Sequence, residues 1–384
     1  MTRVLMSATV PVFIRAFLLP LGEYFRSLGW RVDAMARDLP QCERTREAFD
    51  RVWDIGWSRS PLDPANLLGP PRQLRALVEQ ERYDLVHVHT HVAAFVTRFA
   101  LRHRCAGPKI VYTAHGFSFY PGGARLRNTI LRGIEAFAAR WTDYLVTMNQ
   151  DDFEAARRFA SLPTERVRYM PGIGVDLDRY RPSTIGASSI EGLRRELGLA
   201  PDETVFTMVA EFIHRKRHED AIRAFGKMAN DRAHLLLAGN GPLVPTMREL
   251  ASSLGLEDRV HFLGFRDDIP TLMRASRAVL LVSAQEGLPR SVMEALCLEV
   301  PVIGTRVRGT KDLLDSEHGI LVELGDVDGI ARALDWAAAH PDRCQEMGRR
   351  GRRAMRPYDV RNIIAEHESL YAEALETPIR SAAA

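Results

Sequence analysis

Short runs of β-branched and other apolar residues alternate with longer stretches of helical periodicity along nearly the whole chain. This alternation predicts β-α-β units with right-handed crossovers, and therefore parallel sheets that helices cover on both faces. Strands are expected at residues 4–7, 32–34, 85–89, 110–113, 144–148, 167–170, 204–209, 234–238, 260–263, 278–282, 302–304 and 320–322. The helices expected between them include 14–28, 71–81, 93–103, 125–140, 150–160, 217–228, 244–254, 289–298 and 327–339. The chain is therefore predicted to be an α/β protein.

The alternation is interrupted at residues 171–189, where prolines, glycines, serines and threonines gather as in a linker. A length of 384 residues suits two domains, since domains generally have about 100–200 residues. We expect two Rossmann-like domains, 1–172 and 201–357, joined by a linker at 173–200. Residues 358–384 follow as a helix at 360–376 and a disordered tail at 377–384. Because ligands bind beyond the carboxyl ends of parallel strands, both domains should offer loops to a cleft between them.

Composition and charge exclude several classes of protein. With 52 Lys+Arg against 49 Asp+Glu, the net charge of +3 gives no general reason to expect nucleic-acid binding. The apolar stretch 8–21 contains an arginine and two prolines and is too short to span a bilayer. The cysteines are scattered without a Cys-x-x-Cys pair, which excludes a cysteine-based metal site and suits a reducing compartment: Cys42, Cys105, Cys297 and Cys344. We therefore expect a cytoplasmic protein.

The sharpest local pattern is Glu286-Gly-Leu-Pro-Arg-Ser-Val-Met-Glu294, which follows the expected strand 278–282 and begins a helix. Unpaired backbone N–H groups and the positive dipole end at a helix start favour a phosphate-bearing ligand. Two carboxylates beside such a site are suited to accept hydrogen bonds from the hydroxyls of a nucleotide sugar. The spacing is equally consistent with an ordinary helix that has one acidic residue before it and one on its face.

In the form E-G-L-P-x-S-x-x-E-A, this pattern resembles the signature of the retaining glycosyltransferases of family 4. Other segments resemble the family in the expected order: Tyr-Thr-Ala-His-Gly-Phe at 112–117, Met-Pro-Gly-Ile-Gly-Val-Asp at 170–176, Leu-Ala-Gly-Asn-Gly-Pro at 237–242 and Val-His-Phe-Leu-Gly-Phe at 260–265. Residues 13–17 and 304–309 resemble the subgroup found in bacterial exopolysaccharide and capsule gene clusters.

The resemblance implies the GT-B fold, in which two Rossmann-like domains face each other across a cleft and the C-terminal helix crosses back to the first. It implies transfer of a sugar, with retention, from a nucleotide-diphospho-sugar to an acceptor. We expect a UDP-sugar donor and a polyprenyl-diphosphate-linked glycan or a small-molecule acceptor, in polysaccharide biosynthesis. Same-face attack without a covalent intermediate is expected, with no cofactor and no metal.

Residue roles follow from the same resemblance. His115, Glu286 and Lys216 are the expected catalytic residues, with His115 on the reacting sugar or its leaving phosphate, and Glu294 is expected on the ribose. The expected donor-binding residues are Glu211, Arg215, Lys216, Gly239, Asn240, Gly264, Phe265, Gly287, Leu288, Pro289, Arg290, Ser291 and Glu294. Those on the acceptor side are Phe13, Arg15, Gly116 and Phe117.

One position departs from the family pattern Gly-Arg-Leu-x-x-x-Lys. This chain has Ala-Glu-Phe-Ile-His-Arg-Lys at 210–216, so Lys216 keeps its place but Glu211 replaces the arginine. A carboxylate does not bind a diphosphate directly, so Arg215, Arg217 or Arg290 must supply the second cation. We predict that Arg290 does so and that Glu211 turns toward a neighbouring basic residue. A solvated helix start at 215–218 is the alternative.

Several other patterns admit plainer interpretations. The alternating histidines 87, 89 and 91 could share a face as metal ligands, but they read as an ordinary strand of the family. The triplets Asp-x-Asp at 176–178 and 326–328 could hold a metal in another transferase fold, yet Asp326 is more simply a helix cap. The basic run 349–356 reads as a solvated helix end. His115 itself is the kind of residue that often packs at a strand end.

Three questions stay open. The helical pattern 125–140 is amphipathic and basic, so its apolar stripe either belongs to the core or contacts the inner face of an anionic membrane. A glycoside hydrolase that uses Glu286 and Glu294 as an acid–nucleophile pair is an alternative activity. A non-catalytic protein that binds sugar nucleotides is another, because Glu211 replaces the family arginine.

Overall fold

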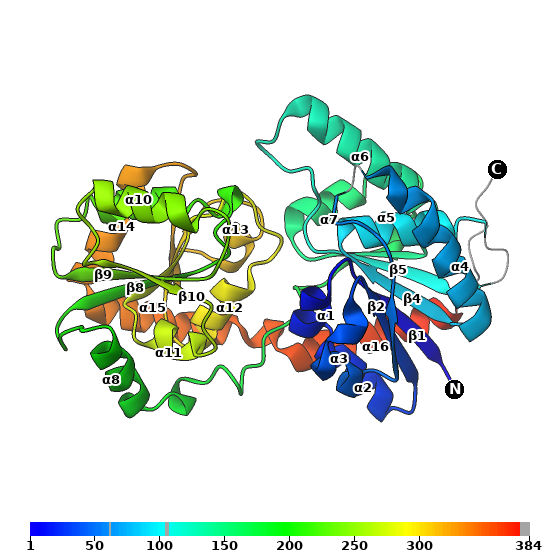
Figure 1. Ribbon diagram of the computed structural model, residues 1–384, viewed down its shortest axis with the longest axis horizontal. Coiled ribbons are helices and arrows are strands. Elements are labelled where there is room, and N and C mark those ends of the chain that lie inside the picture. The colour runs from blue at the N-terminus through cyan, green and yellow to red at the C-terminus, as the bar shows by residue number, and fades with distance from the viewer. Residues whose placement is uncertain (61–62, 104–106, 377–384) are drawn as a thin grey trace. The chain divides into compact units, whose positions relative to one another are not determined.

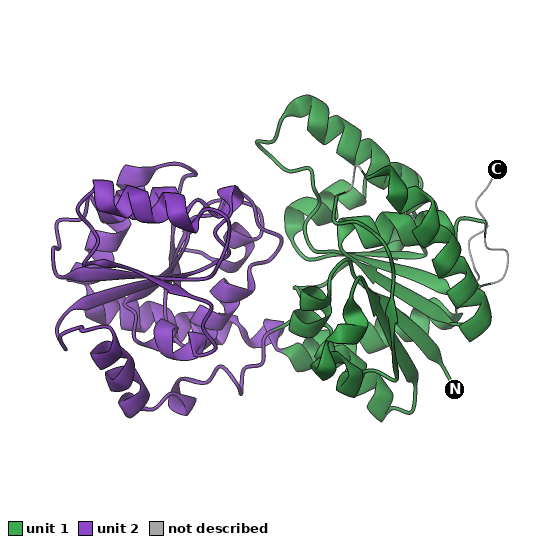
Figure 2. Cartoon of the chain, viewed as in Figure 1, with its two compact units in different colours: residues 1–174, 360–384 green, residues 175–359 purple. Residues whose placement is uncertain are grey.

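The computed structural model describes residues 1–60, 63–103 and 107–376, so Cys105 and the tail 377–384 lie outside the described residues. The chain forms two compact units, coloured separately in Figure 2. Unit 1 comprises residues 1–174 together with 360–384, and unit 2 comprises residues 175–359. The chain therefore passes from unit 1 to unit 2 and back again. No helix in the described ranges is both long and apolar enough to cross a membrane.

Unit 1 is built on a seven-stranded parallel sheet with the order β3-β2-β1-β4-β5-β6-β7. Its strands are β1 (Arg3–Ser7), β2 (Arg31–Ala36), β3 (Arg51–Asp54), β4 (Leu85–His89), β5 (Lys109–Ala114), β6 (Tyr144–Thr147) and β7 (Val167–Tyr169). Its α-helices are α1 (Pro11–Phe17), α2 (Leu19–Ser27), α3 (Glu43–Ala48), α4 (Gly69–Glu81), α5 (His91–Ala100), α6 (Arg125–Ala139), α7 (Gln150–Ala156) and α16 (Val360–Glu376). Figure 1 shows helices on both sides of this sheet.

Unit 2 is built on a six-stranded parallel sheet with the order β10-β9-β8-β11-β12-β13. Its strands are β8 (Thr204–Val209), β9 (Ala233–Ala238), β10 (Val260–Gly264), β11 (Ala278–Leu281), β12 (Val302–Thr305) and β13 (Gly319–Val322). Its α-helices are α8 (Ala187–Glu196), α9 (His218–Phe225), α10 (Val244–Ser253), α11 (Ile269–Arg274), α12 (Arg290–Cys297), α13 (Thr310–Leu313), α14 (Val327–Ala339) and α15 (Pro341–Ala354).

The C-terminal helix α16 completes unit 1. Leu370, Tyr371 and Ala374 are buried in the same apolar cluster as residues of β1 and β2. Two side-chain hydrogen bonds also connect the helix to the rest of unit 1. Tyr24 donates to Glu368 over 2.6 Å, and Tyr144 donates to Glu373 over 3.1 Å. The last described element of the chain therefore packs on the first domain.

Three local expectations differ from the structure. The segment expected as a linker, 173–200, contains α8, whose Leu193 packs in a cluster of unit 2. The strand β3 was not expected, because it is a four-residue edge strand with exposed charged ends and no buried apolar run. The helix expected at 14–28 is divided into α1 and α2, with Pro20 in the first turn of α2, where its missing N–H costs nothing.

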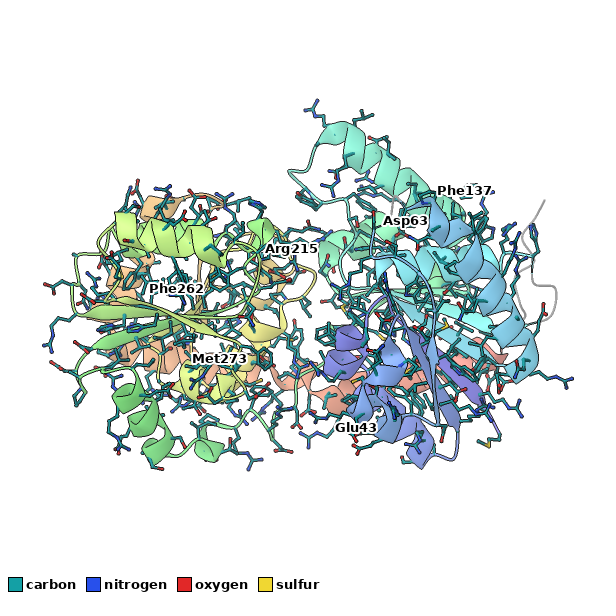
Figure 3. The ribbon with its side chains drawn as sticks, in the orientation of Figure 1. Glu43, Asp63, Phe137, Arg215, Phe262 and Met273 are labelled. Carbon is teal, nitrogen blue, oxygen red and sulfur yellow. The ribbon has the colours of Figure 1, made fainter. Side chains whose placement is uncertain are left out.

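The apolar stripe of α6 is exposed. Four side chains that recur at intervals of three and four residues are exposed by 43–75%: Leu126, Ile130, Ile134 and Phe137. Figure 3 marks Phe137 on this helix, which lies at the periphery of unit 1 in Figure 1. The alternative in which this stripe belongs to the core is therefore wrong.

Candidate active site

The candidate site in unit 2 lies where two neighbouring strands end. After β8 the chain continues to β9 on one side of this pair, and after β11 it continues to β12 on the other side. Parallel sheets commonly bind ligands beyond the carboxyl ends of two neighbouring strands whose connections diverge in this way. The loops after these strands meet there, because the backbone N–H of Ala284 donates to the carbonyl of Arg215 over 2.7 Å. Figure 3 marks Arg215 in the first loop. The expected donor-binding residues on either side of this contact are therefore brought together.

Glu286 is the acidic centre of the second loop. Its side chain is 7% exposed, and its Oε1 lies 2.5 Å from Nζ of Lys216. Arg215 lies 3.6 Å from Oε2 and donates to the carbonyl of Gln285 over 3.2 Å. The guanidinium of Arg308, itself 4% exposed, donates to the backbone carbonyl of Glu286 over 3.0 Å. The position of this carboxylate is thus fixed by the cations around it.

Glu294 lies one to two turns into α12 and uses its two oxygens differently. Its Oε1 accepts a hydrogen bond from the hydroxyl of Tyr180 at 2.6 Å and from Nε of Arg290 at 2.8 Å. Burial, together with the Glu294 carboxylate, raises the pKa of Tyr180, so the phenol keeps its proton and remains a donor. No described residue donates to Oε2. Glu294 is therefore an oriented carboxylate with one oxygen left to accept from a ligand.

Glycines let the loops of the site approach one another. Gly239, at φ 150°, follows β9, and a Cβ there would lie 2.0 Å from the carbonyl oxygen of Ala210. The N–H of Gly239 donates to the carbonyl of Gly264 at the end of β10 over 2.8 Å. Gly309, at φ 78°, lies equally close to Gly287, where a Cβ would be 2.1 Å from the carbonyl oxygen. Larger residues at these positions would displace the loops that carry Glu211 and Glu286.

The remaining expected donor residues lie along the same loops. Gly287, Leu288 and Pro289 connect Glu286 to α12, with Pro289 as the N-cap residue and Ser291 in the first turn. Asn240 lies between the two loop glycines after β9, and its carbonyl accepts from the N–H of Phe212. Phe265, just after β10, is 70% exposed.

His115 follows β5 in unit 1. Its Nε2 lies 2.9 Å from Nδ1 of His89, and the ring of Phe13 meets it edge-on with the centroids 4.6 Å apart. Burial lowers the pKa of His115 to about 3, with smaller contributions from His91 and His367. The imidazole is therefore neutral at pH 7.

The other residues expected on the acceptor side divide into two groups. Phe13 contacts His115, and Arg15 is exposed on α1. Gly116 adopts φ 108°, which lets the chain turn directly after His115. Phe117, by contrast, is fully buried against Phe119, with the ring centroids 4.8 Å apart. The ring of Phe117 therefore belongs to the core, and the place of this residue on the acceptor side stays a prediction.

Comparisons with known proteins agree with this arrangement. Residues 16–179 match the family model described as Glycosyltransferase Family 4, and residues 189–354 match the one described as Glycosyl transferases group 1. The putative glycosyltransferase EpsD of Bacillus subtilis (strain 168) is 32% identical over 375 residues, which are 96% of either chain. This chain belongs to glycosyltransferase family 4.

Two further proteins place this glycosyltransferase among its relatives. It is 29% identical over 268 residues, 68% of either chain, to the UDP-Gal:α-D-GlcNAc-diphosphoundecaprenol α-1,3-galactosyltransferase of Escherichia coli. The crystal structure of Anabaena HepE in complex with UDP-glucose matches it with a TM-score of 0.80 at 21% identity, covering 97% of this chain and all of that one. The two parallel-sheet units are those of the GT-B fold.

The contacts of Glu211 differ from those predicted from the sequence. This side chain is exposed and forms no ion pair within the described part of the chain. The basic neighbours are already paired, since Arg215 and Lys216 approach Glu286 and Arg217 binds Asp220. The prediction that Glu211 turns toward a basic residue is therefore wrong.

The alternative of a solvated helix start at 215–218 is also wrong. His218 is 2% exposed, and its ring stacks on Phe212 with the centroids 3.9 Å apart. Burial lowers the pKa of His218 to about 4. Arg290 pairs with Glu294 in this structure, and its role as the second phosphate contact stays a prediction.

Two residues of the site were not anticipated. Tyr180 lies in the segment expected as a linker, 114 positions before its partner Glu294. Arg308 lies in the segment 304–309, which resembles the family, in a glycine-containing loop that follows the expected strand 302–304. That placement was a usable signal for Arg308, because loops after parallel strands line ligand sites. No comparable feature of the sequence around Tyr180 indicated that this residue belongs to the site.

Other patterns have structural roles. Asp326 is the N-cap of α14 and accepts from the N–H of Gly329 over 2.7 Å, as expected. Asp176 accepts from the N–H groups of Asp178 and Arg179 in a turn. Within the described ranges, no group of three or more histidine, cysteine or acidic residues is arranged to hold a metal ion.

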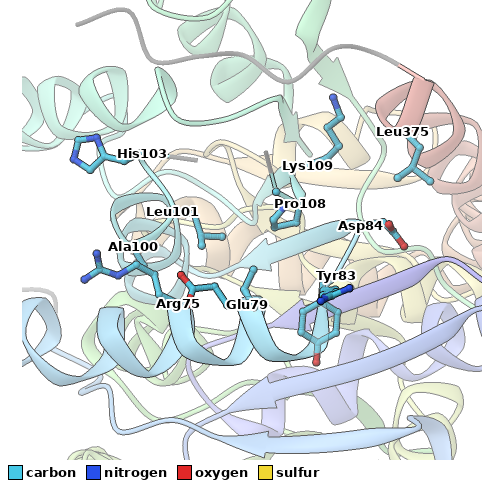
Figure 4. Close-up of a pocket in the computed structure, with 13 residues that line it drawn as sticks. Arg75, Glu79, Tyr83, Asp84, Ala100, Leu101, His103, Pro108, Lys109 and Leu375 are labelled. Atoms are coloured by element: carbon cyan, nitrogen blue, oxygen red, sulfur yellow. The ribbon is translucent and has the colours of Figure 1, made fainter. Parts of the chain in front are cut away.

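A pocket of about 840 Å³ in unit 1 lies away from the expected acceptor residues. Figure 4 shows Tyr83, Asp84 and Lys109 among the residues that line it. Asp84 precedes β4 and Lys109 begins β5, so the pocket is at the amino ends of these strands. Parallel sheets generally bind ligands at the opposite, carboxyl ends of their strands, where His115 and Gly116 follow β5.

Proposed function

We propose that this glycosyltransferase moves a sugar from a UDP-sugar, with retention, to a polyprenyl-diphosphate-linked glycan during polysaccharide biosynthesis. The observation that carries the donor half is the pair of oriented carboxylates, Glu286 and Glu294, on either side of the start of α12. The names of its relatives support the chemistry: one uses UDP-galactose and a diphosphoundecaprenol-linked acceptor, and a structural neighbour is bound to UDP-glucose.

In this proposal the ribose, the diphosphate and the sugar of the donor each contact a different group of unit 2. Oε2 of Glu294 accepts from the ribose hydroxyls, because Tyr180 and Arg290 already occupy Oε1. The first-turn N–H groups of α12 and the ammonium of Lys216 receive the diphosphate. Glu286 accepts from hydroxyls of the transferred sugar, and Lys216, which it holds at 2.5 Å, stays close to the leaving phosphate.

Catalysis then rests on charge that develops as the bond between sugar and phosphate breaks. The nucleoside diphosphate gains negative charge while the sugar becomes oxocarbenium-like, so a fixed cation lowers the barrier. Lys216 supplies that cation in our proposal. The neutral His115 of unit 1 acts as a hydrogen-bond donor to the reacting sugar or to its leaving phosphate, and no metal is required.

The exposed face of α6 supports contact with an anionic membrane, where a lipid-linked acceptor would be found. Its apolar side chains are flanked on the same helix and at its end by four exposed arginines: Arg125, Arg127, Arg132 and Arg140. An apolar stripe beside basic residues is typical of helices that lie in a membrane interface. Co-sedimentation with anionic vesicles tests this: a double variant, Leu126→Gln with Ile130→Gln, should bind less. Leu254→Gln, at an exposed apolar position of unit 2, is the control.

Binding to neutral and anionic vesicles alike, or unchanged binding of the double variant, would refute the membrane contact. The donor is tested separately by thermal unfolding with UDP, GDP and ADP and their sugars. A ligand at 100 times its dissociation constant adds about 2.7 kcal/mol, which is readily measured. We expect UDP to stabilise the protein and GDP and ADP to have little effect.

Turnover decides the activity. With a UDP-sugar and a lipid-linked acceptor, the sugar should appear on the acceptor with the anomeric configuration of the donor, and EDTA should not reduce the rate. Release of free sugar without an acceptor would instead support a hydrolase. Tight UDP-sugar binding without any turnover would support a non-catalytic binding protein. A loss in EDTA that only Mg²⁺ or Mn²⁺ restores would contradict metal independence.

A further inference from the structure

A row of buried histidines leads to the expected catalytic histidine of unit 1. His87 and His89 lie two residues apart on β4, and their ring centroids are 4.0 Å apart. His89 is 1% exposed, and its Nδ1 lies 2.9 Å from Nε2 of His115. His87 does not take part in that bond, because its two nitrogens contact Tyr371 and Thr113 at 2.5 and 2.7 Å.

In a hydrogen bond between His89 and His115, one of the two facing nitrogens carries a proton and the other accepts it. Burial lowers the pKa of both imidazoles far enough that each is neutral at pH 7 and carries a single N–H. Either His89 donates from Nδ1 and leaves Nε2 of His115 as the acceptor, or the roles are reversed. The two arrangements place the remaining proton of His115 on different atoms.

The other nitrogen of His89 decides between the two arrangements. Its Nε2 is buried and has no hydrogen-bond partner in the described part of the chain. In the reversed arrangement this atom would carry the proton, which would leave a buried N–H donor without an acceptor. In the first arrangement the proton lies on Nδ1, where it is used, and Nε2 is a bare nitrogen. The structure therefore favours His89 as the donor and His115 Nε2 as the acceptor.

We propose that His89 is a positioning residue that fixes His115 in the tautomer whose Nδ1 carries the proton. The side chain of His115 is partly exposed, and no described residue hydrogen-bonds to Nδ1. This N–H is thus free to donate to an oxygen of the sugar or of the leaving phosphate. The tautomer itself is a property of the protein alone, and only its use in transfer rests on the proposed function.

The first experiment reads the tautomer without any substrate. In protein with ¹⁵N-labelled histidine, two-bond proton–nitrogen correlation spectra distinguish a ring protonated at Nδ1 from one protonated at Nε2, and His115→Gln identifies the signals of His115. We expect the Nδ1–H form in the wild type. An Nε2–H form would overturn the proposal whatever the enzyme's substrates are, whereas failure to use UDP-sugars would leave this result untouched.

The second experiment removes the donor and then restores it. His89→Leu takes away the N–H, whereas His89→Asn keeps an amide N–H near the position of Nδ1. We expect His89→Leu to mix the two tautomers of His115 and to lower kcat about tenfold with little change in the KM for donor. His89→Asn should recover most of both properties. If His89→Leu does not fold, the wild-type spectrum and His89→Asn still decide the outcome.

Unit 2 offers a matched control for this pair. His234 and His261 form the same kind of contact, with Nδ1 of His234 3.0 Å from Nε2 of His261 on β9 and β10. His234→Leu should leave the tautomer of His115 and the rate of transfer unchanged. A pure Nδ1–H signal for His115 in His89→Leu, or equal losses of rate in His89→Leu and His89→Asn, would show that His89 has no positioning role.

Discussion

The two units share a topology but place different chemistry at the same point of it. In each sheet the central pair, β1 with β4 and β8 with β11, is flanked by strands in the same order. In unit 2 this point is crowded with paired charges, Lys216 with Glu286 and Arg290 with Glu294. In unit 1 it holds neutral groups: the hydroxyls of Thr9 and Thr90 are 2.6 Å apart there.

The two units therefore share a topology, and the loop residues give this point of each sheet a different charge. In unit 2, buried carboxylates hold Lys216 and Arg290 in place, and cations held in place are what the proposed diphosphate ligand requires. In unit 1, burial lowers the pKa of His87, His89 and His115, so these three rings stay neutral. A neutral imidazole has one N–H donor and one acceptor nitrogen. The comparison predicts that loss of charge damages unit 2 most and that gain of charge damages unit 1 most.

The largest effect should come from Lys216→Ala. If the ammonium meets charge that grows on the leaving diphosphate, its loss should lower kcat on the order of 100- to 1000-fold, and donor affinity should fall much less. Steady-state kinetics with a UDP-sugar would measure both. Lys227→Ala is the control, since Lys227 forms an exposed pair with Asp328 at 2.6 Å. Equal rates for the two variants in folded protein would remove Lys216 from the mechanism.

A smaller loss is expected for Glu294→Ala. The ribose would lose a charged acceptor worth roughly 1.5–3 kcal/mol, so UDP should bind about 10- to 150-fold more weakly. Calorimetric titration with UDP and with a UDP-sugar would show the change in both. Glu219→Ala is a matched control because Glu219 pairs with Arg223 on the surface of α9. Unchanged affinity for both ligands would contradict the assignment of Glu294 to the ribose.

As the pH falls, unit 1 should lose stability at a higher pH than unit 2. Burial lowers the pKa of four neighbouring histidines of unit 1: His87, His89, His115 and His367. Below pH of about 6.5 the unfolded chain takes up protons that these folded groups do not, so stability falls as the pH falls, by up to about 1.4 kcal/mol per pH unit for each group. Hydrogen exchange between pH 7 and 5 should show unit 1 opening at the higher pH. Opening of unit 2 at a higher pH than unit 1 would contradict this prediction.

The smallest effect is expected for Tyr180→Phe. Glu294 would lose one donor on Oε1 and keep Arg290, so the carboxylate should be less well oriented but still present. Because the carboxylate and its contact with Arg290 remain, only part of the roughly 1.5–3 kcal/mol of a hydrogen bond to a charged group should be lost, and UDP affinity should fall about twofold to tenfold. Tyr358→Phe in the same unit is the control for removal of a phenol. A loss as large as that of Glu294→Ala would mean that Tyr180 itself contacts the nucleotide.

Much of the fold could be predicted because buried parallel strands are short continuous apolar runs. Strands β4 and β8 occupy the predicted residues 85–89 and 204–209, and α14 occupies 327–339. The exception, β3, is an edge strand whose charged ends face solvent, so it lacks that pattern. The helix α8 was hidden in a segment whose serines and glycines are also typical of linkers.

The α/β class, the two units, the family and the loops that carry the site could all be inferred from the sequence, because each depends on local pattern and on order along the chain. The pairing of groups within the site became visible only in the folded protein. Glu211 had basic neighbours in sequence, yet Glu286 and Asp220 hold them. Tyr180 reaches Glu294 across 114 positions. Such pairs depend on which strand ends meet, and no local pattern records that.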